Sequence, residues 1–157
     1  MAPRFEYTQA EEIRDAFARH RVRYLFLGKS GAILLGYPDT TQDSDLFLEK
    51  SAENGAAAVE ALGELGFTLT EDQREEVRRG KDFIQLKNGP FDLDLVFAPD
   101  GLESFAKAWE RHVEVEGFPV CHPDDIIASK VASNRAKDRE VLPRLRAFRD
   151  YWLSHRR

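Results

Sequence analysis

The sequence predicts an α+β domain in which a mixed β-sheet is flanked by helices and the C-terminal end is helical. Two observations support this prediction. Short apolar runs of strand length alternate with amphipathic segments of helical period, and no internal repeat, low-complexity segment or linker separates them. The 157 residues, of which 42% are hydrophobic and 32% charged, suit a single globular domain (1–157) that is large enough to bury a core.

The N-terminal half is predicted to alternate between helices and strands. Thr8 and Glu11 have capping-box spacing, and Ser51 and Gly66 suit the start and end of an alanine-rich helix. Short apolar and aromatic runs are typical of buried strands. The predicted elements are a helix at Thr8–Arg19, a strand at Tyr24–Leu27, a brief helix at Ala32–Leu35, a strand at Asp45–Glu49, a helix from Ser51 to Leu65 and a short strand at Phe67–Leu69.

Turn signals divide the C-terminal half into hairpins and helices. Asn88-Gly89 and Glu116-Gly117 each separate two apolar runs, and Pro123 suits the first turn of a helix. Asp72–Arg79 is charged enough to be either a loop or an exposed helix. The remaining predicted elements are strands at Phe83–Leu86 and Phe91–Phe97, a helix at Leu102–Trp109, strands at Val113–Val115 and Phe118–Cys121, a helix at Pro123–Ala132 and a last helix at Glu140–Leu153.

Composition and charge exclude several classes of protein. No apolar run approaches the ~20 residues of a membrane span, and the basic start Met1–Arg4 lacks a signal-peptide core, so we expect a cytoplasmic protein without a membrane partner. The single Cys121 excludes an internal disulfide framework. Residues 1–125 carry a net charge of -11 and residues 126–157 carry +6. The basic part could meet a polyanion such as RNA, or it could be a solvated helical face.

Two Asp-x-Asp pairs lie in predicted strands, where apolar residues would be expected. Residues two apart on a strand point to the same face, so Asp43 and Asp45 project side by side, as do Asp92 and Asp94. Burying carboxylates is unfavourable without a cation, and their oxygens suit Mg2+. Two such ions, with Mn2+ able to substitute, can clamp the oxygens of an in-line phosphoryl displacement. The alternative is the polar face of a half-exposed sheet.

A glycine-rich turn follows the first predicted strand. Small residues at Gly28, Ser30 and Gly31 would let backbone N–H groups approach a triphosphate. A P-loop is excluded, because that motif needs a glycine where the chain has Arg23. The four histidines show no zinc-ligand spacing.

Together these motifs resemble the signature of the nucleotidyltransferase superfamily, which has the DNA polymerase β-like fold. That signature is a strand, Gly-Gly or Gly-Ser, a short helix and then Asp-x-Asp. Counted from Gly28, its longer form expects a small residue, Gly, Thr and the acidic pair at the offsets where the chain has Gly31, Gly36, Thr41, Asp43 and Asp45. The family's third carboxylate lies on a later strand that continues with apolar residues. Asp94 fits that position best, with Asp92 as the alternative.

The C-terminal part resembles the small nucleotidyltransferases grouped with AbiEii-type toxins. The similarity is carried by the run from His122 to Lys130, followed by the run from Arg135 to Asp138. By this resemblance Lys130 would balance charge on the nucleotide phosphates, and Asp138 would orient Lys130 or a neighbour.

The resemblance implies a Mg2+-dependent enzyme that moves an NMP from an NTP to an acceptor hydroxyl. The acceptor would be tRNA or another RNA, a protein or a small molecule, and a toxin of this group would have a cognate antitoxin. The implied catalytic residues are Asp43, Asp45, Asp94 and Lys130, with the three aspartates as metal ligands. The implied nucleotide-binding residues are Gly28, Lys29, Ser30, Thr41 and Asp138.

Three positions depart from the family pattern. Lys29 stands where Gly or Ser is usual, and Asp39 stands where relatives often carry Arg. Both alter the charge that a triphosphate would meet, and they support an alternative function as a catalytically inactive nucleotide-binding or regulatory module. Ser44 replaces the usual apolar residue between the two acids, which predicts an edge position or a partly open strand.

Overall fold

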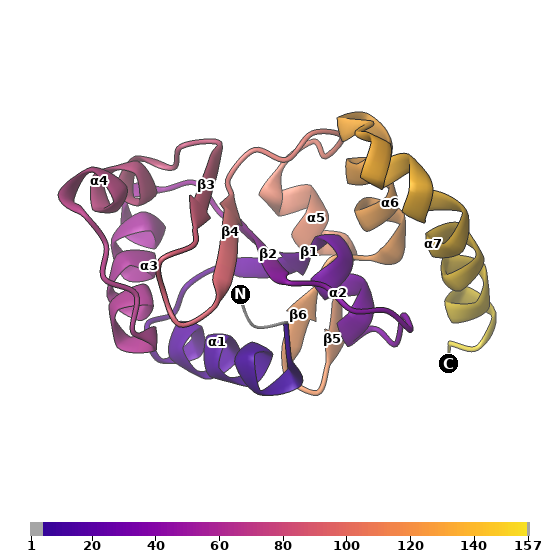
Figure 1. Cartoon of the computed structure of the whole chain (residues 1–157), viewed down its shortest axis with the longest axis horizontal. Coiled ribbons are helices and arrows are strands. Elements are labelled where there is room, and N and C mark those ends of the chain that lie inside the picture. Colours follow the sequence, from indigo (N-terminus) through magenta and orange to yellow (C-terminus); the bar gives the residue numbers. More distant parts are fainter. Residues whose placement is uncertain (1–4, 157) are drawn as a thin grey trace.

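A computed structural model describes residues 5–156 and contains one mixed six-stranded sheet (Figure 1). The strand order across the sheet is β3-β4-β2-β1-β6-β5. The strands are β1 (Tyr24–Leu27), β2 (Asp43–Leu48), β3 (Phe83–Leu86), β4 (Asp92–Val96), β5 (Val113–Val115) and β6 (Phe118–Val120). The two outer pairs, β3 with β4 and β5 with β6, are antiparallel hairpins, as the turn signals predicted. In the centre, β2 is antiparallel to β1 and parallel to β4.

The helices lie on both faces of the sheet. Figure 1 shows α1, α3 and α4 gathered on one side of the molecule, with α5, α6 and α7 on the other. The helices are α1 (Tyr7–Arg19), α2 (Gly28–Leu34), α3 (Ala52–Leu65), α4 (Glu71–Arg79), α5 (Phe105–Arg111), α6 (Pro123–Ser133) and α7 (Ala136–Ser154). Between residues 5 and 156, no helix is long and apolar enough to cross a membrane. The predicted α+β class, with helices at the C-terminal end, is confirmed.

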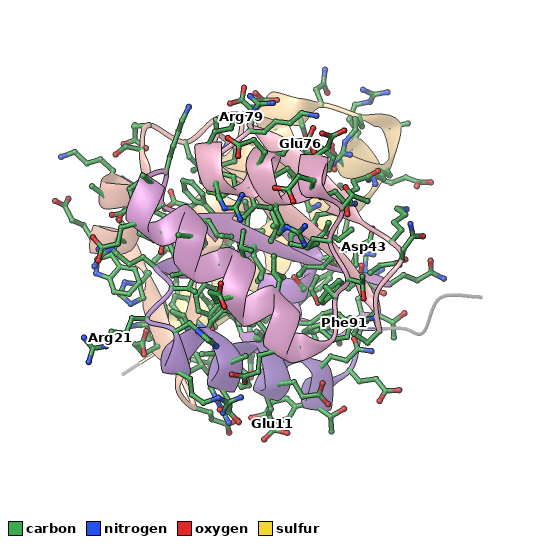
Figure 2. The ribbon with its side chains drawn as sticks, turned by 90° about the vertical axis from the view of Figure 1, so that its left-hand side faces the viewer. Glu11, Arg21, Asp43, Glu76, Arg79 and Phe91 are labelled. Atoms are coloured by element: carbon green, nitrogen blue, oxygen red, sulfur yellow. The ribbon has the colours of Figure 1, made fainter. Side chains whose placement is uncertain are left out.

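One face of the sheet is covered by an apolar core. Strand residues at alternate positions, such as Leu46, Leu93 and Leu95, are fully buried and belong to the same cluster as Phe17 of α1 and Leu62 of α3. Figure 2 looks at this side of the molecule, with α3 in front, α1 below it and α4 above it. The apolar residues at every second position of the strands and those on one side of α1 and α3 therefore form a single core.

The other face of the sheet is covered over only part of its width. A second apolar cluster joins Leu25 and Leu27 of β1 and Phe47 of β2 to Phe105 of α5 and Ile126 of α6. Asp92 and Asp94, the residues of β4 that alternate with its core leucines, do not belong to it. The β2–β4 side of this face therefore carries the carboxylates.

The predicted boundaries of several elements need correction. Helix α2 begins at Gly28 rather than Ala32, and α7 begins at Ala136 rather than Glu140. At α1 the cap is Glu6, whose N–H donates to the Gln9 side chain at 3.3 Å, so the predicted Thr8 cap is wrong. Thr8 instead lies within the first turn of the helix.

Three other local predictions are decided by the structure. Phe67 and Leu69 do not form a strand; they bury their side chains in the core from the connection between α3 and α4. The charged segment after them is a helix, because Thr70 caps it through a hydrogen bond from the Gln73 N–H and Gly80 ends it at a φ of 71°. The edge position predicted from Ser44 is wrong, since β2 lies between β4 and β1 and Ser44 is fully buried.

Candidate active site

The two Asp-x-Asp pairs lie on neighbouring strands in register. Asp43 pairs with Asp92 and Asp45 with Asp94, across the parallel strands β2 and β4. Register partners on parallel strands point to the same face of the sheet, so all four carboxylates share the partly covered face. Three of them, Asp43, Asp45 and Asp94, line a cavity of about 610 Å³. Asp92, which is 8% exposed, is not among its lining residues.

The glycine turn passes directly against one of these carboxylates. Leu27, the last residue of β1, is the register partner of Asp45, and Gly28 follows with a φ of +63°. A Cβ atom at Gly28 would lie 2.0 Å from the Asp45 Oδ2 atom. Glycine is therefore required at this position both by the left-handed backbone and by the closeness of the carboxylate.

Ser30 connects this turn to β2. Its hydroxyl donates to the Leu27 carbonyl at 3.0 Å and accepts from the Asp45 N–H at 3.0 Å. The side chain is fully buried and does not line the cavity. Any contact of Ser30 with a phosphate would therefore come from its backbone, while its hydroxyl holds Asp45 in place.

The two unusual charges, Lys29 and Asp39, form an ion pair. The Lys29 Nζ atom is 3.2 Å from Asp39 Oδ2, and Arg144 of α7 is 3.8 Å from the same oxygen. The hydrogen bond from the Thr40 N–H, with Lys29 as a further cause, lowers the pKa of Asp39. Lys29 and Thr41 both line the cavity. Thus the negative charge added at Asp39 is balanced next to the turn.

Helix α6 and the start of α7 also line the cavity. Lys130, whose side chain is 14% exposed, places its Nζ atom 3.5 Å from the Asp138 Oδ1 atom. Asp138 is fully buried and accepts hydrogen bonds from the Ser133 hydroxyl at 2.5 Å and from Arg135 Nε at 3.0 Å. These contacts fix Asp138, and Asp138 in turn holds the Lys130 ammonium at the cavity.

The protonation of these groups reflects the crowding of charge. Burial works to raise the pKa of Asp138, but the hydrogen bonds from Ser133 and Arg135, with the charge of Lys130, leave that pKa well below its usual value. Burial lowers the pKa of Lys130, and the Asp138 carboxylate opposes this.

The carboxylates on the sheet are shifted in the opposite direction. Burial and then the neighbouring Asp94 raise the pKa of Asp45, while burial and then Asp43 raise the pKa of Asp94. Asp94 Oδ1 is buried and finds no hydrogen-bond partner within residues 5–156. A bound cation would reduce the repulsion between these carboxylates and would supply a partner for Asp94 Oδ1.

The donor chemistry of this cluster fits a hard divalent cation. Its members offer only carboxylate oxygens, which Mg2+ and Mn2+ prefer, and they include the unpartnered oxygen of Asp94. Among residues 5–156, however, no group of three or more His, Cys, Asp or Glu side chains stands in an arrangement ready to hold a metal ion. Asp43, Asp45 and Asp94 nevertheless line the same cavity.

Several cavity residues were not predicted from the sequence. The exposed face of β3 contributes side chains because its residues alternate between buried and exposed positions, and the segment after β4 contributes further lining residues. The alternation of Phe83 and Gln85 with buried apolar residues was a usable signal, since it puts both on one face of β3, where Gln85 is the register partner of Asp94 and Phe83 that of Val96. The additional lining residues with polar or aromatic side chains are Asp82, Phe83, Gln85, Asp100, Ser129, Ser133, Arg135 and Lys137.

Comparisons with known proteins support the fold. No protein-family model matches the chain, and no curated protein matches it significantly. The structure is similar to the crystal structure of a Thermotoga maritima protein that has been proposed to be a nucleotidyltransferase. The TM-score is 0.57 at 17% sequence identity, over 95% of this chain and 92% of that chain. The chain therefore has a nucleotidyltransferase-like α+β fold, with its acidic cavity on the partly covered face of the sheet.

Proposed function

We propose that this chain is a Mg2+-dependent nucleotidyltransferase that moves an NMP from an NTP to an acceptor hydroxyl. The observation that carries the proposal is the presence of Asp43, Asp45, Asp94 and Lys130 around one cavity, next to the glycine turn. Carboxylates and an ammonium around one cavity suit a substrate that is a polyphosphate with a divalent cation. The similar fold of a protein that has been proposed to be a nucleotidyltransferase adds support.

Each side chain has a proposed role. Asp43, Asp45 and Asp94 would hold Mg2+, as two ions, with Mn2+ able to substitute, and Asp92 is the alternative to Asp94. When bound, Mg2+ neutralises charge on the phosphates and polarises the reacting phosphoryl group. The backbone of the turn at Gly28 would approach the triphosphate, since no side chain blocks it there.

The two lysines of the cavity would bind the phosphates from different sides. Lys29 would exchange its contact with Asp39 for one with a phosphate oxygen, and Thr41 lies beside it on the cavity wall. Lys130, oriented by Asp138, would stabilise charge that develops on the leaving pyrophosphate.

The reaction forms one bond and breaks another at the α-phosphorus. The acceptor oxygen bonds to that phosphorus while the bond to the oxygen bridging the α- and β-phosphates breaks, and pyrophosphate leaves with that oxygen. Asp94 would hold Mg2+ through one carboxylate oxygen and would take the proton of the acceptor hydroxyl on the other.

The alternative function is a catalytically inactive nucleotide-binding or regulatory module. Its support came from Lys29 and Asp39, and the ion pair between them reduces that support, because the two charges offset each other beside the turn. A toxin that modifies RNA and is neutralised by a cognate antitoxin is a narrower form of the enzyme proposal, and it stays a prediction from the resemblance.

The test is metal-dependent binding followed by transfer. Purified chain with Mg2+ and each labelled NTP should transfer label to one of three acceptor pools: total tRNA, protein, or small hydroxyl compounds. The D43N/D45N double variant should lose both Mn2+ binding, measured by electron paramagnetic resonance, and transfer. Asp72→Asn, an exposed acid on α4, is the matched control. Nucleotide binding without any transfer would favour the inactive module, and transfer by the double variant would place the chemistry elsewhere.

A further inference from the structure

The glycine turn and helix α7 contact the same carboxylate. Asp39 lies in the connection between α2 and β2, and its Oδ2 atom is 3.2 Å from Lys29 Nζ and 3.8 Å from Arg144 Nη1. Its Oδ1 atom accepts a hydrogen bond from the Thr40 N–H at 2.7 Å. Two cations from different helices therefore share one oxygen of Asp39.

The three side chains differ in their access to the cavity. Lys29 is among the residues that line it, whereas Asp39 and Arg144 are not. The side chain of Asp39 is only 23% exposed, while that of Arg144 is 62% exposed. Asp39 thus holds the Lys29 ammonium from outside the cavity, and a phosphate inside the cavity would compete with Asp39 for it.

Arg144 is attached to this connection by more than the ion pair. Its guanidinium carbon lies 5.6 Å from the centre of the Tyr37 ring, and its Nη2 atom donates to the Pro38 carbonyl at 3.5 Å. Tyr37 is buried, and its ring packs edge-on against Phe148 of α7 at a centroid distance of 5.6 Å. Arg144 therefore contacts three consecutive residues, 37–39, and the first two of these contacts do not depend on the ion pair.

Separating Lys29 from Asp39 would be more unfavourable without Arg144 than with it. Among residues 5–156, Lys29 and Arg144 are the cations within 4.0 Å of Asp39. With Arg144 in place, the carboxylate keeps one cation and the Thr40 N–H after Lys29 has left. Without Arg144, a carboxylate of which little is exposed would lose its last cation as a polyphosphate approached. Asp39 would then hold Lys29 more firmly and would repel the polyphosphate.

We propose that Arg144 is a positioning residue for polyphosphate binding, which keeps Asp39 paired when Lys29 leaves it for a phosphate oxygen. Asp39 is an internal competitor that holds Lys29 in the absence of a polyphosphate, and α7 weakens this competition through Arg144. The inference rests on the proposed function, because that function brings a polyphosphate into the cavity.

The test measures the affinity of inorganic tripolyphosphate with Mg2+ by isothermal titration calorimetry, so that neither turnover nor base preference enters. Asp39→Asn should bind it about threefold more tightly than the wild type, because Asn still accepts the Thr40 N–H but no longer holds Lys29 by charge. Arg144→Gln should weaken binding about threefold. The matched control is Arg146→Gln, which removes the same charge from an exposed position of α7 that does not line the cavity.

Double variants isolate the contact between Arg144 and Asp39. R144Q should weaken binding more than R146Q in the wild-type background, and the two should have equal effects in the D39N background, where no carboxylate needs a second cation. Equal effects in the wild-type background would overturn the proposal. A larger effect of R144Q that persists in D39N would also overturn it, because Arg144 would then act on the polyphosphate directly.

A second readout follows Arg144 itself. In the full chain labelled with 15N-arginine, the Arg144 Nε–H signal is assigned by its absence in R144Q. Tripolyphosphate with Mg2+ should shift this signal in the wild type and far less in D39N, because the shift reports the loss of Lys29 from the shared carboxylate. An unshifted signal in the saturated wild type would contradict the role of Arg144.

The same titrations distinguish failure of this role from failure of the proposed function. Tripolyphosphate binding that needs Mg2+ and is lost in D43N/D45N, together with equal effects of R144Q and R146Q, would leave the proposed function standing and remove the role of Arg144. Absence of binding in both the wild type and D39N would count against both.

Discussion

The two faces of the sheet differ although they are built from the same strands. Leu93 and Asp94 are adjacent on β4, yet Leu93 is fully buried in the apolar core below α1 and α3, while Asp94 lines the cavity on the other side. One face contributes stability through apolar burial, and the other places repelling carboxylates close together. Site and core are therefore separated by one residue along the strand, so the effects of substitutions on activity and on folding can be measured separately.

The largest effect is expected from a substitution on the carboxylate face. Asp94→Asn should lower the rate of nucleotidyl transfer by about 10³-fold, because it removes charge that is needed at the reacting centre. Asp92→Asn is the matched control on the same strand, since Asp92 does not line the cavity. The measurement is single-turnover transfer of labelled NMP. A larger loss in D92N than in D94N would make Asp92 the third ligand.

The metal-free protein should become less stable as pH rises, because of Asp45 on the same face. Burial and Asp94 raise the pKa of Asp45 in the folded state, so the unfolded chain loses this proton first, at a pH of about 4. The free energy of unfolding therefore carries a contribution that is present below that pH and is lost as pH rises through the raised folded pKa.

Asp45→Asn removes this contribution. Thermal melts in EDTA across pH 4 to 9 should show D45N gaining on the wild type as pH increases, and Mg2+ should reverse the order at high pH by stabilising only the wild type. A pH-independent difference in EDTA would show that Asp45 titrates normally in the folded protein.

A substitution on the apolar face should lower stability and leave metal binding nearly unchanged. Leu93→Ala leaves a cavity in the core and should lower the free energy of unfolding by about 3 kcal/mol. Urea denaturation measures this loss, and Mn2+ affinity measured well below the denaturation midpoint should change little. A large loss of Mn2+ affinity in the folded variant would mean that the two faces are coupled through β4.

The smallest effects are expected from alanine substitutions at two glycines. Gly28→Ala forces a Cβ against Asp45 at a positive φ and should destabilise the protein by about 1–2 kcal/mol while weakening nucleotide binding. Gly63→Ala in α3, where a Cβ meets nothing within 4 Å, should instead stabilise by about 0.5–1 kcal/mol. Urea denaturation of both variants provides the test. Equal responses would mean that the turn at Gly28 relaxes to admit a side chain.

Much of the fold could be predicted because its signals are local. The hairpin between β3 and β4 follows from Asn88-Gly89, and α3 from Ser51 and Gly66, which cap it as predicted. Predictions from local signals were wrong where packing between distant segments decided which residues are buried. Phe67 and Leu69 have strand-like composition but fill the core from a connection, and Ser44 is polar yet occupies a fully buried central position.

The sequence by itself determined the α+β class, the order of the strands and helices outside Phe67–Arg79, and the presence of two Asp-x-Asp pairs on strands. These features depend on residue periodicity and turn chemistry, which act over a few neighbouring residues. Only the tertiary structure decided that Asp94 rather than Asp92 lines the cavity, that Lys29 pairs with Asp39, and that Gln85 lies beside Asp94. Those relations depend on strand register and on which helices cover the sheet, and both are set by packing between segments far apart in the chain.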